Sequence, residues 1–104
     1  MKYINLTPHE IVLNDGTTFP PSGAIARVNA SFSEFDSDGI CEQIFGDVQD
    51  LPQPEEGIAF IVSGLVLSAL KGARPDVVAP ATGHPAVVRN DKGQIASVPG
   101  FVRG

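Results

Sequence analysis

The sequence predicts an α+β fold, with a mostly antiparallel β-sheet or small partial barrel and one short helix near residues 64–71. Three observations lead to this prediction. Nine prolines and eleven glycines among 104 residues interrupt the chain too often for long helices. Two turn signals of the hairpin type separate segments rich in apolar residues. Helical capping residues flank one apolar segment late in the chain.

The first elements are short strands joined by turns. Residues 3–6 predict a strand that is interrupted at Pro8, because proline has no backbone N–H for a ladder and restricts Thr7 to an extended conformation. Residues 10–19 resume the extended chain. The Asp-Gly pair at 15–16 predicts a tight hairpin turn within them, since both residue types tolerate positive φ.

The next segments give weaker signals. After a stiff turn at Pro20-Pro21, residues 24–28 alternate apolar and polar side chains, as a half-buried strand does. Residues 29–39 predict a loop. Residues 40–48 fit either a strand with a bulge at Gly46 or one helical turn.

The second half contains the central strand and the helix. Residues 58–63 are the most apolar stretch and predict a strand buried on both faces. Ser63 is suited to cap the N-terminus of the following helix, Lys71 to its negative C-terminal end and Gly72 to its closure. Residues 76–80 predict a short strand or an extended arm.

The chain ends in a second predicted hairpin. Residues 86–98 contain the type I turn signal Asn90-Asp91-Lys92-Gly93, in which the glycine takes a positive φ. No repeat, low-complexity tract or long linker divides the chain. We therefore expect a single compact domain over residues 1–104.

Cysteine content and hydropathy indicate the compartment. The one cysteine, Cys41, cannot form an internal disulfide, which favours a reducing environment. The N-terminus lacks the apolar core of a signal peptide. The longest uncharged apolar run, residues 57–70, is shorter than the roughly 20 residues that a membrane span needs. We expect a cytoplasmic protein outside the membrane.

The net charge of −5 is unevenly distributed. No Lys or Arg occurs from Val28 to Leu70, and that segment holds eight carboxylates. Residues 71–104 carry five basic side chains against two acidic ones. This asymmetry predicts either a solvated acidic surface or an acidic face that meets the basic face of another protomer. A duplex-DNA binder is not expected, because it needs a dense basic stripe.

The corner formed by Thr7, Pro8 and His9 is the first candidate site. Pro8 stiffens the approach to His9, so its imidazole could bind a metal, donate to a phosphate or act as a base. The alternative is a local turn in which Thr7 and Glu10 bond nearby backbone and His9 is held by a backbone hydrogen bond. Leu13 occupies the second histidine position of a His-Glu-x-x-His motif, so a zinc-protease helix is excluded.

Other catalytic and metal motifs are lacking. The two histidines, His9 and His84, do not have the close spacing of zinc ligands. Residues 34–45 resemble a calcium loop but place Phe45 where a bidentate glutamate is required. The chain has no Gly-x-Ser-x-Gly elbow, phosphate loop or dinucleotide fingerprint. We expect no metal, no cofactor and no catalytic residue.

Residues 71–89 concentrate polar groups among turns. Arg74 and Arg89 are suited to hold a carboxylate or phosphate by bidentate hydrogen bonds, with Thr82 completing an anion pocket. The alternative is an Arg74–Asp76 turn, with Arg89 pointing to solvent. The candidate ligand-binding residues are Thr7, His9, Arg74, Asp76, Thr82, His84 and Arg89.

Several segments together resemble a known family. They are "NLTPHEIVL", "PPSGAIARV", "FIVSGLV", "RPDVVAPATG" and "VVRNDKGQIASVPGF". With them the chain resembles a family of small uncharacterised proteins of bacteriophages, prophages and bacterial genomes, over nearly its full length. Asn-Leu-Thr-Pro-His at 5–9 is the most specific mark. The resemblance implies a bacterial or phage origin and a cytoplasmic setting, and no activity.

These observations lead to three hypotheses. The first is a non-catalytic, homo-oligomeric module that binds a small anionic or nucleotide-like ligand, which requires Arg74 and Arg89 to share a concavity with the corner at residues 7–9. The second is a structural or protein-interaction domain with an acidic central surface. The third, a hydrolase with His9 or His84 as base, ranks last because no orienting triad is evident.

Overall fold

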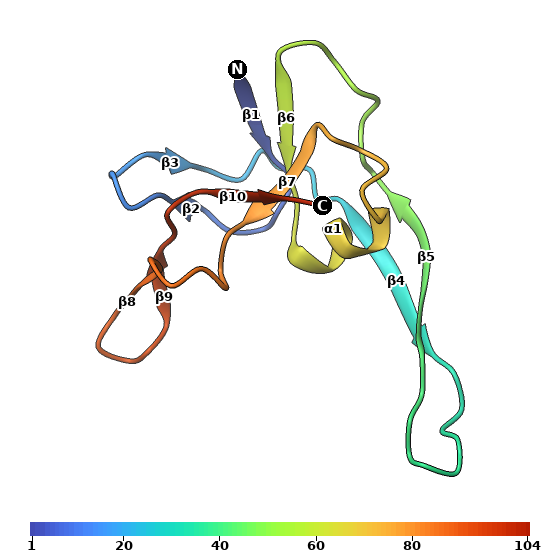
Figure 1. Cartoon of the computed structure of the whole chain (residues 1–104). Helices are drawn as coiled ribbons and strands as arrows, with labels where there is room; N and C mark the ends of the chain where they lie inside the picture. Colours follow the sequence, from blue (N-terminus) through green and yellow to red (C-terminus); the bar gives the residue numbers. More distant parts are fainter.

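The computed structural model describes all residues from Met1 to Gly104 and contains four separate sheets (Figure 1). The central sheet has the strand order β1-β6-β7-β10, formed by β1 (Lys2–Asn5), β6 (Ile58–Ile61), β7 (Val77–Pro80) and β10 (Phe101–Arg103). The other sheets are two-stranded: β2 (Ile11–Val12) with β3 (Thr18–Phe19), β4 (Arg27–Phe32) with β5 (Gln43–Gln49), and β8 (Val88–Arg89) with β9 (Ile95–Ser97). None is closed, and the predicted α+β class is confirmed.

The pairing is antiparallel everywhere except at the centre. β1 and β7 both pair with β6 in parallel, while β10 pairs with β7 antiparallel, as do the strands of the three small sheets. The parallel β6–β7 contact requires a crossover, which the helix α1 (Gly64–Leu70) supplies. β10 was not predicted from the sequence.

The helix lies where its capping residues predict it. Ser63 Oγ accepts a hydrogen bond from Val66 N at 3.3 Å, so the predicted N-cap is confirmed. At the other end Lys71 takes a left-handed conformation with φ of 52°, and its N–H donates to Ser68 O. Gly72 follows with φ of 78°, so both residues close the helix.

The central sheet separates two small apolar clusters. On one face Phe60, Val77 and Ala79 pack with α1 through Val66 and Leu67. On the other face Ile61 and Val78 pack with Ile11 and Val98. β6 is therefore buried on both faces, as predicted, and period-2 alternation divides its side chains between the clusters. Only 16 of the 104 residues are buried, so the core is small for the length of the chain.

The two edge strands of the central sheet meet through aromatic rings. Tyr3 of β1 stacks on Phe101 of β10, with ring centroids 5.3 Å apart. Phe19 of β3 meets both rings edge-on, at 5.3 Å and 5.5 Å. Since β1 and β10 are at opposite ends of the strand order, this contact shows that the sheet is strongly curled.

The β4–β5 hairpin projects from this body as an arm, which we define as residues 27–49 (Figure 1). The prediction of a loop over residues 29–39 is wrong for its first part. β4 extends to Phe32, because residues 30–32 pair with residues 43–45. Gly46 and Asp47 together oppose the single Asn29, so the strand with a bulge at Gly46 is the correct alternative.

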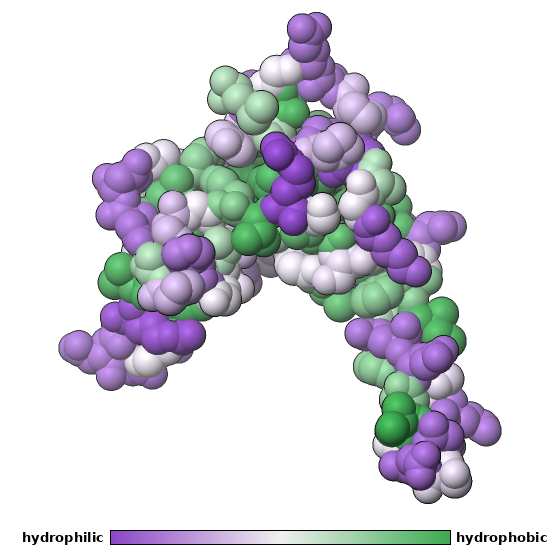
Figure 2. All heavy atoms as spheres, in the orientation of Figure 1, coloured by the Kyte–Doolittle hydropathy of each residue, from purple (hydrophilic) through white to green (hydrophobic).

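The arm makes the molecule elongated. The radius of gyration is 15.4 Å and the extents are 48 × 38 × 21 Å. A compact chain of this length has a radius of gyration of about 13 Å. The space-filling view shows hydrophobic side chains along the projecting part (Figure 2).

Candidate functional site

The corner after β1 is organised by a residue that the sequence had not singled out. Asn5 is 3% exposed, and its Nδ2 donates to His9 O at 2.8 Å and to Phe19 O at 2.9 Å. Its Oδ1 accepts from Thr7 N at 2.9 Å and from Thr7 Oγ1 at 2.7 Å. All four hydrogen-bonding positions of the Asn5 amide are thereby used, and Thr7 forms the local turn that the alternative hypothesis described.

The His9 side chain points away from this network. Only the backbone of His9 is held, through its carbonyl and its N–H, while the side chain is exposed and takes no intramolecular hydrogen bond. The alternative role suggested for Glu10 in the turn is not seen, because its side chain makes no hydrogen bond to the corner. The imidazole is therefore presented to solvent by a rigid corner.

Three parallel strands end at the same edge of the central sheet. β1 is followed by Thr7 and His9, β6 by Ser63, and β7 by Thr82 and His84. The carboxyl edge of parallel strands is where open sheets characteristically bind ligands. The geometry thus gathers three chain segments that lie far apart in the sequence.

Three adjoining depressions lie along this edge, and none of them is lined by both His9 and His84. One, of about 550 Å³, lies between α1, β10 and the turn at His84. The next two lie beside His9, and all three share Pro80 and Thr82. We call this surface the strand-end groove; it is defined by Thr7, His9, Ser63, Pro80, Thr82 and His84.

His84 is oriented by its own loop. The N–H of Ala86 donates to His84 Nδ1 at 3.0 Å, so the neutral imidazole carries its proton on Nε2. The carbonyl of Ala86 in turn accepts from Asn14 Nδ2 at 2.8 Å. Asn14 Oδ1 accepts from Ser97 Oγ at 2.6 Å, which ties the loop to β9. His84 therefore presents an Nε2–H donor from an anchored turn.

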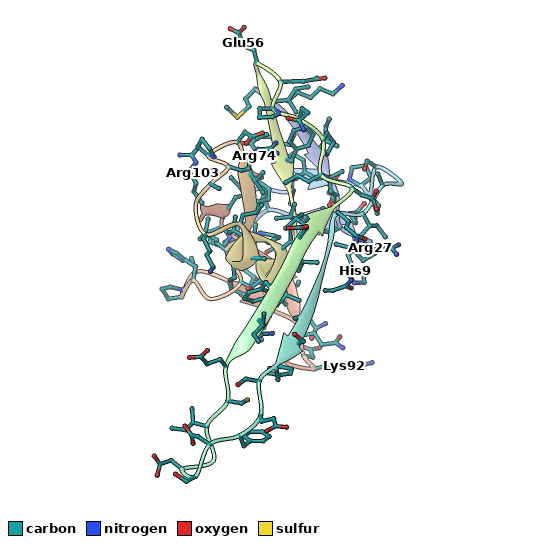
Figure 3. The ribbon with its side chains drawn as sticks, turned by 90° about the vertical axis from the view of Figure 1, so that its right-hand side faces the viewer. His9, Arg27, Glu56, Arg74, Lys92 and Arg103 are labelled. Atoms are coloured by element: carbon teal, nitrogen blue, oxygen red, sulfur yellow. The ribbon has the colours of Figure 1, made fainter.

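Arg74 and Asp76 bind each other. Arg74 Nε and Nη2 donate to the two carboxylate oxygens of Asp76 at 2.9 Å and 2.8 Å, and Nη2 also donates to Pro52 O at 2.9 Å. These hydrogen bonds lower the pKa of Asp76 and raise the pKa of Arg74. The pair precedes β7 and lies at the opposite end of that strand from the groove, and Figure 3 places Arg74 well away from His9.

Arg89 also lies outside the groove. Its Nη1 donates to Gly93 O at 2.8 Å and so braces the turn of the β8–β9 hairpin. The four predicted residues Thr7, His9, Thr82 and His84 line the groove. The structure does not bring Arg74, Asp76 or Arg89 to them, because each is engaged at another turn.

No group of three or more His, Cys, Asp or Glu side chains lies close enough together to hold a metal ion. No helix has the length and apolar content needed to cross a bilayer. Comparison of the chain with protein-family models, curated proteins and solved structures finds no match.

Proposed function

We propose that the protein is a non-catalytic binding module that takes a small anionic or nucleotide-like ligand in the strand-end groove. One observation carries this proposal: the ends of β1, β6 and β7 bring Thr7, His9, Thr82 and His84 to adjoining depressions along one edge of the sheet, with Thr82 in each of them. Small-molecule sites are typically concave, mostly apolar and furnished with a few convergent polar groups.

The lining of the groove supports a ligand with an anionic head and a flat or apolar body. Hydrogen-bond donors come from the exposed His9 side chain, His84 Nε2–H and the Thr82 hydroxyl. Leu67, Pro80 and Val102 supply apolar surface. The only carboxylate on its rim is Glu10, beside the depression between β2 and β9.

A thermal-shift screen tests the groove. The probes are inorganic phosphate, nucleoside monophosphates and cyclic dinucleotides. A ligand present at 100 times its Kd stabilises the folded state by about 2.7 kcal/mol. We expect the shift to disappear in Thr82→Val, which keeps the side-chain shape but removes the hydroxyl, and to weaken in His9→Gln. Arg89→Gln is the matched control and should keep the full shift, since Arg89 lies outside the groove. A screen without any shift, or a shift that only Arg89→Gln removes, overturns the proposal.

A second function is favoured by the arm. Its acidic, partly apolar surface supports a protein-interaction role for the chain. Replacing residues 33–42 by an Asn-Gly turn shortens the arm while keeping the base that packs on the core. We expect the shortened protein to stay folded and to lose the associations of the full chain; unchanged association would exclude the arm as an interface.

The proposal extends to origin and location. We assign the chain to the bacteriophage and prophage family that residues 5–9 resemble, in a cytoplasmic setting. The lone free thiol of Cys41 supports a reducing compartment. Fractionation of host cells tests the location, and recovery of the protein from the cell exterior would contradict it.

A further inference from the structure

The arm exposes more large apolar side chains than any other part of the molecule. Phe32, Phe35, Ile40 and Ile44 are 66%, 72%, 63% and 52% exposed. Phe32 lies on the same face of the hairpin as Ala30 and Phe45, because residues 30 and 45 are directly paired and side chains alternate along each strand. Ile44 lies on the opposite face, so the arm exposes apolar side chains on both faces and at its tip. Exposed apolar side chains gathered in one projecting segment mark an interaction site.

The tip of the arm is held in one conformation without contacts to the core. Asp36 Oδ1 accepts from Asp38 N at 2.9 Å and from Ile40 N at 3.0 Å. Ser33 Oγ accepts from Glu42 N at 2.8 Å. These bonds fix the turn that carries Phe35 and Ile40, so little conformational entropy remains to be lost when a partner binds.

The molecule has the excess surface that a dimer needs. Its accessible surface is 6885 Å². A compact monomer of this mass exposes about 5,600 Å². The excess of about 1,300 Å² exceeds the roughly 800 Å² that each partner contributes to a standard interface. Burying the arm against another molecule would bring the exposed area into the usual range.

The β8–β9 hairpin complements the arm in charge and in apolarity. The arm carries the carboxylates of Glu34, Asp36, Asp38, Glu42 and Asp47, and apart from Arg27 at its base it has no Lys or Arg. The β8–β9 hairpin carries Arg89 and Lys92 against the single carboxylate of Asp91, together with Val88 and Ile95, which are 49% and 39% exposed. Figure 1 shows the two hairpins projecting on different sides of the central sheet. A contact between them therefore requires two molecules.

We infer that the acidic arm of one protomer docks on the basic β8–β9 hairpin of a second copy of this chain. A two-fold axis makes the contact reciprocal and closes the dimer. Apolar side chains of the arm cover Val88 and Ile95, and the carboxylates of Glu34 and Glu42 face Arg89 and Lys92. The inference rests on the interaction role proposed above for the arm, and the docking site adjoins the strand-end groove at Ile95, which lines the depression between β2 and β9.

Sedimentation velocity of the full chain across a concentration series, at low and high salt, tests this inference. We expect a dimer that weakens as salt rises. Phe35→Ser with Ile40→Ser should raise the dimer Kd by about tenfold or more. Glu34→Lys with Glu42→Lys should dissociate the dimer, and so should Arg89→Glu with Lys92→Glu. An equimolar mixture of these two charge-reversed proteins should form a heterodimer, which misfolded variants cannot do.

A matched control separates specific contact from general electrostatics. Glu55→Lys with Glu56→Lys makes the same charge change in the same acidic segment, at the end of the molecule opposite the arm tip (Figure 3). This variant should dimerise like the natural sequence. If it dissociates as readily as the arm variant, the inference is overturned.

Three further outcomes separate the failure of the proposed dimer contact from the failure of the interaction role of the arm. A chain that stays monomeric at every concentration in low salt overturns the second copy as partner. A dimer that responds to arm variants but not to the hairpin reversal overturns the docking site and leaves the arm as an interface. A dimer that responds to neither overturns both.

Discussion

Asn5 donates to the carbonyl of His9 at 2.8 Å and to that of Phe19 at 2.9 Å, so one buried amide joins the corner after β1 to the end of β3. The conformation of residues 5–9 thus has a structural explanation that does not depend on a ligand. The network also fixes the backbone of Thr7 and His9, which line one of the depressions of the groove.

Replacing Asn5 by Ala should destabilise the fold. The change removes the Asn5 partner of the Phe19 carbonyl and of the Thr7 N–H, whereas the His9 carbonyl keeps its bond from Thr7 Oγ1 at 3.1 Å. Each unsatisfied buried group costs about 1–3 kcal/mol. We expect the free energy of unfolding in urea to fall by about 3 kcal/mol. Asn29→Ala serves as control, since Asn29 is exposed, and should change it by less than about 0.5 kcal/mol. Equal effects of the two changes would contradict the role of Asn5.

The aromatic contact across the curled sheet should be a second determinant of stability. Phe101→Ala removes a ring that touches both Tyr3 and Phe19. Because Phe101 is only half-buried, the loss should lie near the lower end of the range for such changes, about 3 kcal/mol. Tyr3→Phe keeps the ring and should leave the melting temperature nearly unchanged. A large loss in Tyr3→Phe would indicate that the hydroxyl, and not the stacking, matters.

Because of the Arg74–Asp76 pair, the natural protein and the Asp76→Asn variant should differ in how their free energy of unfolding depends on pH. Hydrogen bonds from Arg74 hold the pKa of Asp76 below its ordinary value of 3.8, so the stabilisation is complete above that pH and is lost as the pH falls through the lower, folded-state pKa. Asp76→Asn should be less stable by about 1–3 kcal/mol at neutral pH. The difference in free energy of unfolding between the natural protein and Asp76→Asn should become smaller below pH 3.8. Denaturant unfolding at several pH values measures it. A gap that stays constant in acid would argue against the pair.

The left-handed conformation of Lys71 predicts a stabilising change. Its φ of 52° carries a steric cost for any residue with a Cβ, roughly 1 kcal/mol, which glycine avoids. Lys71→Gly should therefore be more stable than Lys71→Ala by up to about 1 kcal/mol, since both remove the same charge. Thermal unfolding of the two variants measures this difference. A more stable alanine variant would show that the helix end rearranges.

Short-range signals in the sequence predicted the local structure well. The N-cap Ser63 and the two hairpin turns appear where residue chemistry places them, and the bulge at Gly46 is one of the two alternatives left open for residues 40–48. Gly16 and Gly93 take positive φ of 92° and 78° in those turns. Such features depend on contacts within a few residues, which a sequence displays directly. The first hairpin loop is nevertheless longer than the predicted two residues. Leu13 N donates to Thr17 O, so residues 14–16 form the loop between these two bonded residues.

Only the tertiary structure decided which distant segments meet. The parallel pairing of β1 with β6 joins residues more than fifty positions apart and leaves no local mark in either strand. Together with the β6–β7 pairing, it brings Thr7, His9, Thr82 and His84 to one edge of the sheet, while Arg74 and its partner Asp76 lie at the other end of β7. Turns and caps follow from the chemistry of neighbouring residues, whereas the position of a side chain relative to a remote one follows from how the small apolar core closes.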